Sequence, residues 1–122
     1  MRIRLLSCLV LCLLLAHAPG AAAHALLKHA SPPVGGTVST PPTKISLQFS
    51  EPIEPAFSHI KLATKAGDAV ELGPVSLDPN DSARLIAVVR STLGPGVYKV
   101  SWRVVSVDTH STEGDYTFEV KP

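Results

Sequence analysis

The stretch YKVSWRV, residues 98–104, decides the fold class of this chain. Apolar and polar side chains alternate along it, so every second side chain falls on one face of an extended strand. The same period of two recurs elsewhere, at residues 45–49, 59–62 and 116–120. Residues 85–89 form a continuous apolar run of strand length, and weaker strand patterns surround Val38 and Val70. No segment has the spacing of an amphipathic helix, so the chain is predicted to be all-β.

Clusters of turn-forming residues separate these predicted strands. They are rich in proline, glycine, asparagine and aspartate and lie at residues 32–36, 41–42, 66–68, 78–81 and 94–96. About seven short strands at this spacing predict a Greek-key antiparallel β-sandwich of the immunoglobulin-like or small-barrel type. Trp102 lies on the apolar face of its strand and is therefore expected in the core.

The composition fits one domain that does not bind nucleic acid. The chain has 122 residues, 45% of them hydrophobic, with 11 Lys and Arg against 10 Asp and Glu. This length allows a single ordinary domain. The apolar content excludes full disorder, and the 11 prolines exclude a coiled coil. Nucleic-acid recognition usually needs a basic stripe, whereas the charges here are nearly balanced.

Residues 1–23 have the three-part pattern of a secretory signal peptide. Arg2 and Arg4 give the segment a positive start, and residues 5–16 are almost wholly apolar. Small alanine residues follow at positions 21–23, as signal peptidase requires. The pattern therefore predicts export of the protein and removal of this segment.

Two alternatives for this segment are less consistent with the sequence. A membrane anchor needs about 20 apolar residues, which is longer than the run found here. A lipid-attachment box would place Cys8 after the apolar run, whereas Cys8 precedes most of it. We therefore expect cleavage after Ala23, which leaves residues 24–122 as one domain that is not embedded in the membrane and begins at His24.

The predicted exported domain contains no sulfur. Cys8, Cys12 and Met1 are the only cysteines and the only methionine of the chain, and all three lie in the predicted signal peptide. No disulfide can then form, although an exported protein's compartment would permit one. The domain also has no thiolate or thioether for a soft metal ion.

Asp108 and His110 form the sharpest candidate site. If the chain stays extended beyond the strand of residues 98–104, their side chains point to the same side, about 6.7 Å apart along the strand. A carboxylate and an imidazole at that spacing can share one small ion. The alternative is that His110 is an ordinary solvated histidine of an exposed loop.

His24 provides a second half of this site if the chain is cleaved after Ala23. A free N-terminal histidine offers its α-amine and its ring Nδ1 to one ion, and both groups lose a proton near neutral pH. Together with Asp108 and His110, the donors are three nitrogens and one oxygen, a set that suits Cu(II) in a tetragonal arrangement. The alternative is that His24 simply frays in solvent.

In the order of its motifs the chain resembles the CopC family of periplasmic copper-resistance proteins. The matching motifs begin at His24 and continue through residues 31–32, 47–51, 96–103, 105–110 and 114–120. The resemblance implies a Greek-key β-sandwich that binds one Cu(II) ion per chain in the periplasm, through His24, Asp108 and His110. It also places Glu51 behind the metal, where a carboxylate can orient a ligand. A membrane copper-transport protein and periplasmic copper oxidases are the partners that the resemblance implies.

Three features depart from the family pattern. Some relatives have a methionine-rich loop that holds Cu(I), whereas residues 63–69 contain no methionine, so this Cu(I) site is expected to be absent. Many relatives begin His-x-His, but Leu26 occupies the third position of the predicted mature chain. His29 and His59 match no ligand position of the family and are expected to be exposed, at most as weak secondary sites.

The preferred function is that of a copper carrier or buffer without catalysis. The rival is an oxidative enzyme similar to the copper monooxygenases that begin with a histidine. Such an enzyme needs an open position for oxygen and a cycle through Cu(I), whereas Asp108 would fill a position with a hard anionic donor that favours Cu(II). A metal-free adhesion or chaperone module is a third possibility, and Zn(II) could occupy the same donors.

Overall fold

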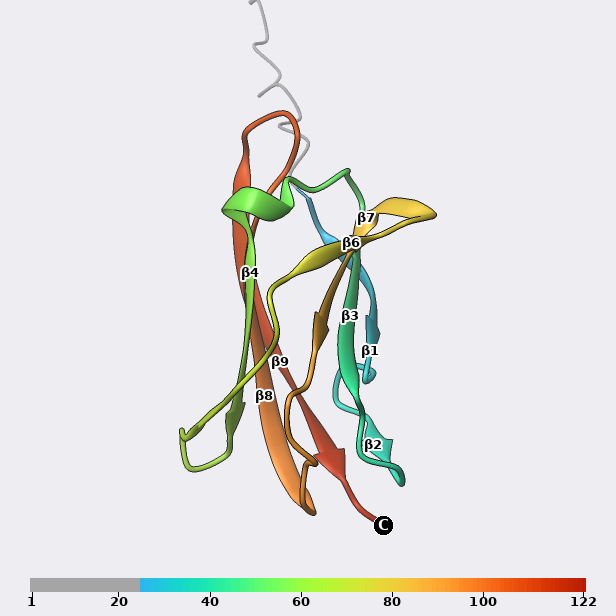
Figure 1. Cartoon of the computed structure of the whole chain (residues 1–122), viewed down its shortest axis with the longest axis vertical. Helices are drawn as coiled ribbons and strands as arrows, with labels where there is room; N and C mark the ends of the chain where they lie inside the picture. Colours follow the sequence, from blue (N-terminus) through green and yellow to red (C-terminus); the bar gives the residue numbers. More distant parts are fainter. Residues whose placement is uncertain (1–24) are drawn as a thin grey trace, which may run out of the picture.

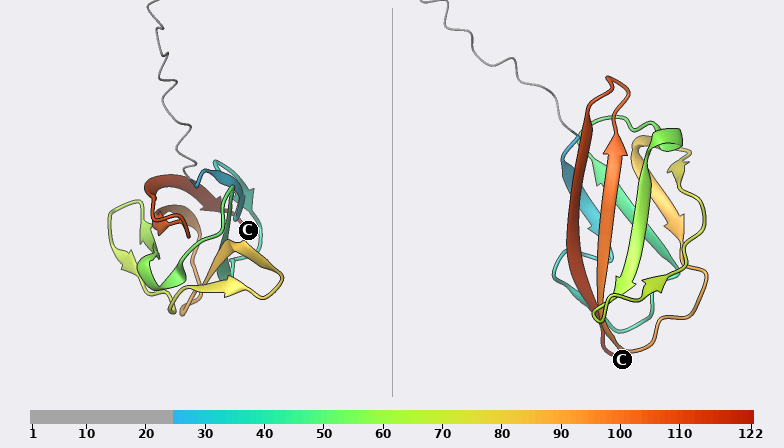
Figure 2. Two further views of the ribbon diagram at one scale, coloured as in Figure 1. Left: turned by 90° about the horizontal axis from the view of Figure 1, so that it is seen from above. Right: turned by 90° about the vertical axis from the view of Figure 1, so that its left-hand side faces the viewer.

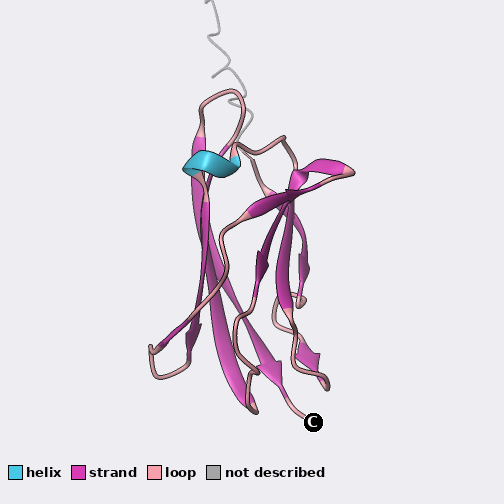
Figure 3. Ribbon diagram, in the orientation of Figure 1, coloured by secondary structure: helices cyan, strands magenta, loops and turns pink. Residues whose placement is uncertain are grey.

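The computed structural model describes residues 25–122, which form two β-sheets packed face to face (Figure 1). One sheet has four strands in the order β1 (Leu27–Ser31), β3 (Lys44–Phe49), β7 (Asp81–Val88) and β6 (Ser76–Asp78). The other has five, in the order β2 (Thr37–Val38), β9 (Ser111–Val120), β8 (Gly96–Val105), β4 (His59–Thr64) and β5 (Ala69–Val70). Within the described range, the single helical element is one 3-10 turn, η1 (Pro55–Phe57), as Figure 3 shows.

The predicted all-β sandwich is confirmed, with two strands more than the sequence pattern indicates. Strands β1 and β6 are the additional ones. Strand β1 lies at the edge of its sheet and keeps most of its side chains half-buried or exposed, so its sequence shows little alternation. Strand β6 has only three residues, which is too short for a period of two to stand out.

The strand connections give the sandwich its Greek-key character. Strands β3 and β7 are neighbours in one sheet, although the chain visits the other sheet through β4 and β5 between them. The named strands pair antiparallel except for β2 and β9, which are parallel where Thr37 faces Glu119 and Val38 faces Val120. Figure 2 shows β9, β8 and β4 side by side in the larger sheet.

The core lies between the two sheets and is made of side chains that alternate along the central strands. The most deeply buried large apolar residues are Phe49, Phe118, Ile45, Leu47, Ile53, Leu85, Val100, Val104 and Val120. Trp102 is only partly buried, so the core position expected for it is confirmed in part. Its ring meets that of Phe49 edge-on, with the centroids 6.2 Å apart, and this contact joins β8 of one sheet to β3 of the other.

One end of the sandwich gathers segments that are far apart in the sequence. The turn between β8 and β9 lies at this end beside η1, close to where the described chain begins (Figures 1 and 2). The backbone N–H of Glu54 donates to the carbonyl of Val105 at 2.8 Å, and the N–H of Val107 donates to the carbonyl of Pro52 at 3.1 Å. These bonds hold the segment before η1 against the turn that contains Asp108 and His110.

Candidate metal centre

Asp108 and His110 lie in the turn between β8 and β9. The ladder of the two strands ends just before and just after this turn. Thr109 has a φ of +73°, in the left-handed region, and its N–H donates to the carbonyl of Ser106 at 2.9 Å. The chain is therefore not extended here, because the backbone must reverse direction to join two neighbouring antiparallel strands.

The turn nevertheless brings these two predicted ligands together. Nδ1 of His110 lies 3.4 Å from Oδ1 of Asp108. The two side chains are 47% and 40% exposed, so an ion can reach them from solvent. Donor atoms roughly 2.0–2.2 Å from one ion, at angles of about 90–110°, lie roughly 2.8–3.6 Å apart. The spacing of the pair therefore fits a shared ion, and it does not favour copper over zinc.

Asp108 is held in its charged form. The hydroxyl of Ser106 donates to Oδ1 of Asp108, and this bond is the main reason why the pKa of Asp108 lies below its ordinary value of 3.8. The side chain and N–H of His110 lower the pKa further, against partial desolvation, which raises it. A ligand carboxylate must be deprotonated, and this environment keeps Asp108 deprotonated to lower pH than an ordinary aspartate.

The first described residues are fixed beside the turn. Ala25 is 2% exposed, and its carbonyl accepts a hydrogen bond from Oγ1 of Thr112 at 2.8 Å. The N–H of Leu26 donates to Oγ of Ser50 at 2.9 Å, and the N–H of Ser50 donates to the carbonyl of Leu26 at 2.8 Å. His24 and the predicted signal peptide lie outside the described residues.

Glu51 lies in the segment that borders the turn. It is half-buried and stands between Ser50, which contacts Leu26, and Pro52, whose carbonyl accepts a hydrogen bond from Val107 at 3.1 Å. The backbone on either side of Glu51 is thus tied to both parts of the candidate site.

The other described histidines are separate from this pair. His29 is exposed on β1, and His59 is exposed on β4, as expected for both. Within residues 25–122, no three His, Cys, Asp or Glu side chains are arranged to hold a metal ion. The described part of the chain contains two of the three residues that the sequence predicts as ligands, Asp108 and His110.

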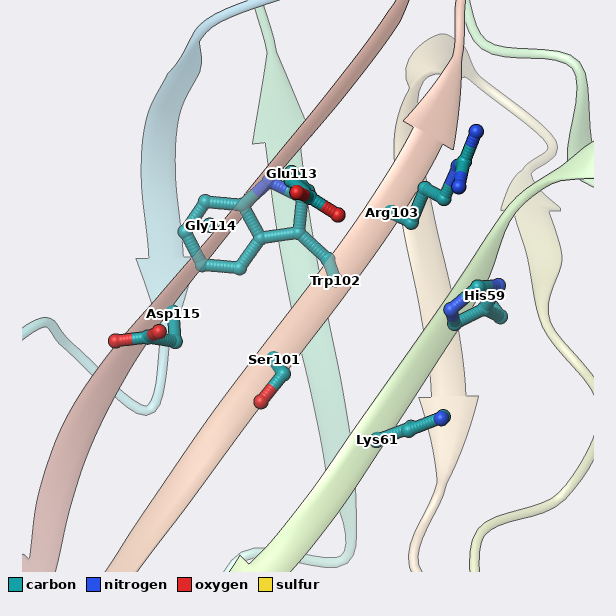
Figure 4. Close-up of a pocket in the computed structure, with 8 residues that line it drawn as sticks. All are labelled: His59, Lys61, Ser101, Trp102, Arg103, Glu113, Gly114 and Asp115. Atoms are coloured by element: carbon teal, nitrogen blue, oxygen red, sulfur yellow. The ribbon is translucent and has the colours of Figure 1, made fainter.

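His59 instead lines a shallow hollow on the outer face of the larger sheet, which Figure 4 shows. The hollow has a volume of about 610 Å³. His59 and Lys61 of β4 lie on one side of it, and Glu113 and Asp115 of β9 lie on the other. Its charged groups come from three neighbouring strands and face solvent, which is typical of the exposed face of a sheet.

Ser106 is the one residue of the centre that the sequence analysis does not single out. It is fully buried, and its hydroxyl contacts the carboxylate of Asp108. The sequence does contain a pattern that indicates its burial. The period of two that points Val104 of β8 into the core predicts the same direction for Ser106, which directly follows the strand. A serine at an inward position next to a candidate ligand therefore calls for a hydrogen-bond partner.

No helix within residues 25–122 is both long enough and apolar enough to cross a membrane.

Comparison with known proteins identifies the family. The family model of the CopC domain matches residues 27–121. Protein YobA of Escherichia coli strain K12 is 40% identical over 103 residues, which cover 84% of this chain and 83% of YobA. Copper resistance protein C of Pseudomonas syringae pv. tomato is 38% identical over 96 residues, which cover 75% of this chain and 76% of that protein.

A solved structure agrees with these relatives. The crystal structure of PcoC, a methionine-rich copper resistance protein from Escherichia coli, matches with a TM-score of 0.73 and 38% identity. The match covers 81% of this chain and 100% of PcoC. The two proteins differ in methionine content, because Met1 is the single methionine of this chain. The family model and the identity to copper resistance proteins establish that this chain belongs to the CopC domain family.

Proposed function

We propose that this protein is a periplasmic Cu(II) carrier or buffer with one metal site per chain. The proposed ligands are His24, through its α-amine and ring, together with Asp108 and His110. The observation that supports this most strongly is the 3.4 Å approach of His110 Nδ1 to Asp108 Oδ1. The carbonyl of Ala25 accepts a hydrogen bond from Thr112, two residues beyond His110, and this contact supports the proposal that the residue before Ala25 is a ligand.

The donor set favours Cu(II) over Cu(I). Nitrogen and oxygen donors suit Cu(II), whereas Cu(I) prefers thiolate and thioether sulfur. Residues 24–122 contain neither cysteine nor methionine, so we propose that the methionine-rich Cu(I) site of some relatives has no counterpart here. Glu51 is assigned the role of orienting a ligand from outside the coordination sphere, as outer carboxylates do in many metal sites.

The biological setting follows from the leader and the relatives. A signal peptide at residues 1–23 would deliver the domain to the periplasm, with cleavage after Ala23. The relative from Pseudomonas syringae is named a copper resistance protein, which supports a role in copper resistance or homeostasis. We propose a membrane copper-transport protein and periplasmic copper oxidases as partners, with no catalytic role for this protein itself.

A Cu(II) titration of protein that begins at His24 tests the proposal. Electron-spin resonance should show one bound ion per chain with nitrogen ligands. His110→Ala should remove one nitrogen and change the spectrum, whereas the matched control His59→Ala, on the outer face of β4, should leave it unchanged. An unchanged spectrum for His110→Ala would exclude this residue as a ligand.

The same preparation separates the carrier from an oxidative enzyme. Copper-loaded protein is mixed with ascorbate and oxygen, and hydrogen peroxide is measured. A carrier should give no more turnover than the free-ion background. Sustained production of peroxide above that background would mean that the protein is an enzyme and not a carrier. In a separate titration, competition between Cu(II) and Zn(II) measures which ion the same donors bind more tightly.

A further inference from the structure

Ser106 combines complete burial with a hydroxyl that faces both described ligands. Its exposed fraction is 0%. The hydroxyl donates to Oδ1 of Asp108 and also faces the carbonyl of His110 at 3.2 Å. The N–H of Ser106 donates to that same carbonyl at 2.9 Å. One buried residue is therefore bonded to the side chain of one proposed ligand and to the backbone of the other.

The carboxylate of Asp108 is a stronger hydrogen-bond acceptor for the hydroxyl of Ser106 than the carbonyl of His110 is. A serine has a single O–H, which cannot donate fully to the carboxylate and the carbonyl together. A hydrogen bond to an ionised carboxylate is roughly twice as strong as one between neutral groups. The carbonyl of His110 already accepts a hydrogen bond from the N–H of Ser106. It therefore keeps a donor when the hydroxyl of Ser106 donates to the carboxylate of Asp108.

Ser58 shows how a merely structural serine is used at the same end of the fold. It is also buried, with an exposed fraction of 8%. Its hydroxyl donates to the carbonyl of Glu54 at 2.7 Å and accepts the N–H of Val105 at 3.0 Å. Both partners are backbone groups. Ser106 differs because its hydroxyl bonds to a side chain that the proposed function assigns to the metal.

We propose that Ser106 is a positioning residue of the copper site. Its hydroxyl fixes the carboxylate of Asp108 in the turn, and its N–H fixes the backbone of His110, so the two ligands are held at one spacing before the metal arrives. This inference rests on the proposed function, since it concerns the same site. Outer partners of this kind typically change metal affinity by roughly 10–100-fold.

A double-mutant cycle with Asp108 tests the role. In protein that begins at His24, Ser106→Ala should weaken Cu(II) binding by roughly 10–100-fold and alter the electron-spin spectrum. In an Asp108→Ala background the same change should have less than about a twofold effect, because the hydroxyl then has no side-chain oxygen at residue 108 to restrain. Ser58→Ala is the matched control and should leave both the affinity and the spectrum unchanged.

The outcomes separate this inference from the proposed function. If the unmodified protein binds no Cu(II), the proposed function fails. If it binds, and Ser106→Ala binds equally well with the same spectrum, the positioning role fails while the carrier role stands. Should Ser106→Ala not fold, the hydroxyl proton of Ser106 is followed by NMR in the metal-free protein. Slow exchange that is lost in Asp108→Ala supports the contact, and equal exchange in both proteins overturns it.

Discussion

The indole of Trp102 lies against the backbone of Gly114. The two residues face each other across β8 and β9, and a Cβ atom at Gly114 would come within 2.5 Å of Cζ2 of the indole. The ring reaches across β9, as Figure 4 shows, because residue 114 has no side chain. On its other sides the ring meets Phe49 and Tyr116, with both pairs of centroids 6.2 Å apart.

Gly114→Ala should therefore destabilise the fold. The added methyl group needs space that the indole fills, and the aromatic neighbours prevent the rigid ring from moving away. Overpacking of this kind costs about 1–3 kcal/mol. Urea unfolding followed by the fluorescence of Trp102, the only tryptophan, measures the loss. Gly94→Ala is the control, since a Cβ there has nothing within 4 Å, and an equal loss in both variants would refute the argument.

Tyr116→Phe should cost more stability than Tyr98→Phe. The hydroxyl of Tyr116 donates to the carbonyl of the buried Pro32 at 2.7 Å, and burial raises the pKa of Tyr116 well above its ordinary value of 10.0. The phenol is protonated and donates at neutral pH, and burial extends this range to higher pH. Removing it leaves a buried carbonyl unpaired, at about 1–3 kcal/mol.

Tyr98 makes a matched comparison. Its hydroxyl donates to the carbonyl of Gly94 at 2.8 Å, only four residues away and partly open to solvent. Water can replace that bond, so Tyr98→Phe should lose roughly 0.5–1.5 kcal/mol. Chemical denaturation of both variants gives the two values, and equal losses would mean that water also reaches Pro32.

Asp81 should make stability depend on pH. The N–H of Ala83, at 3.0 Å, is the main cause that lowers the pKa of Asp81 below 3.8, followed by Gln48 at 2.9 Å and Arg84. A lowered folded-state pKa means that the unfolded chain takes up its proton first as the pH falls. The stabilisation of the fold by ionised Asp81 is therefore fully present above the pKa of this residue in the unfolded chain. It is lost as the pH falls through the lower pKa of the folded chain.

Asp81→Asn should accordingly be less stable than the natural chain at neutral pH. The difference should shrink as the pH falls from about 5 to about 3, because the natural chain then loses its carboxylate contacts as well. Urea midpoints across this range give the result. Asp68→Asn, whose side chain makes none of these contacts, serves as the control, and a constant difference for Asp81→Asn would contradict the argument.

An additional residue before His24 should nearly abolish Cu(II) binding. A Met placed there converts the α-amine into a peptide N–H, so one proposed nitrogen donor is lost. The affinity should fall by more than about 100-fold, beyond the roughly 10–100-fold effect of losing an outer partner. Competition with a chelator measures it. A chain extended after Pro122 is the control, and unchanged affinity in the Met-His24 protein would remove the amine from the ligand set.

Local sequence pattern was enough to predict the sandwich and most of its strands. The alternation in residues 98–104 and 116–120 places side chains in or out by the geometry of a single strand, so it needs no knowledge of the partner strand. The sequence pattern did not predict strands β1 and β6, because β1 is an edge strand with mixed exposure and β6 has only three residues. The parallel pairing of β2 with β9 also has no local signal.

The candidate site was predictable in its residue types but not in its geometry. Asp108 and His110 were chosen for the chemistry of their side chains, and the structure brings them together through a turn instead of an extended strand. Ser106 was not chosen, because a serine is recognised as a partner only when its burial and its acceptor are known.

The sequence by itself determined the all-β class, the donor atoms available to a metal and the absence of sulfur from residues 24–122, because each of these depends only on residue identity and on neighbours along the chain. Only the tertiary structure decided two hydrogen bonds. Thr112 donates to the carbonyl of Ala25, 87 positions away, and the hydroxyl of Ser106 donates to the carboxylate of Asp108. Such contacts arise when the two sheets close over their shared core and fix segments that no local pattern relates. The left-handed backbone at Thr109 lies in the turn between β8 and β9 that brings Asp108 and His110 together.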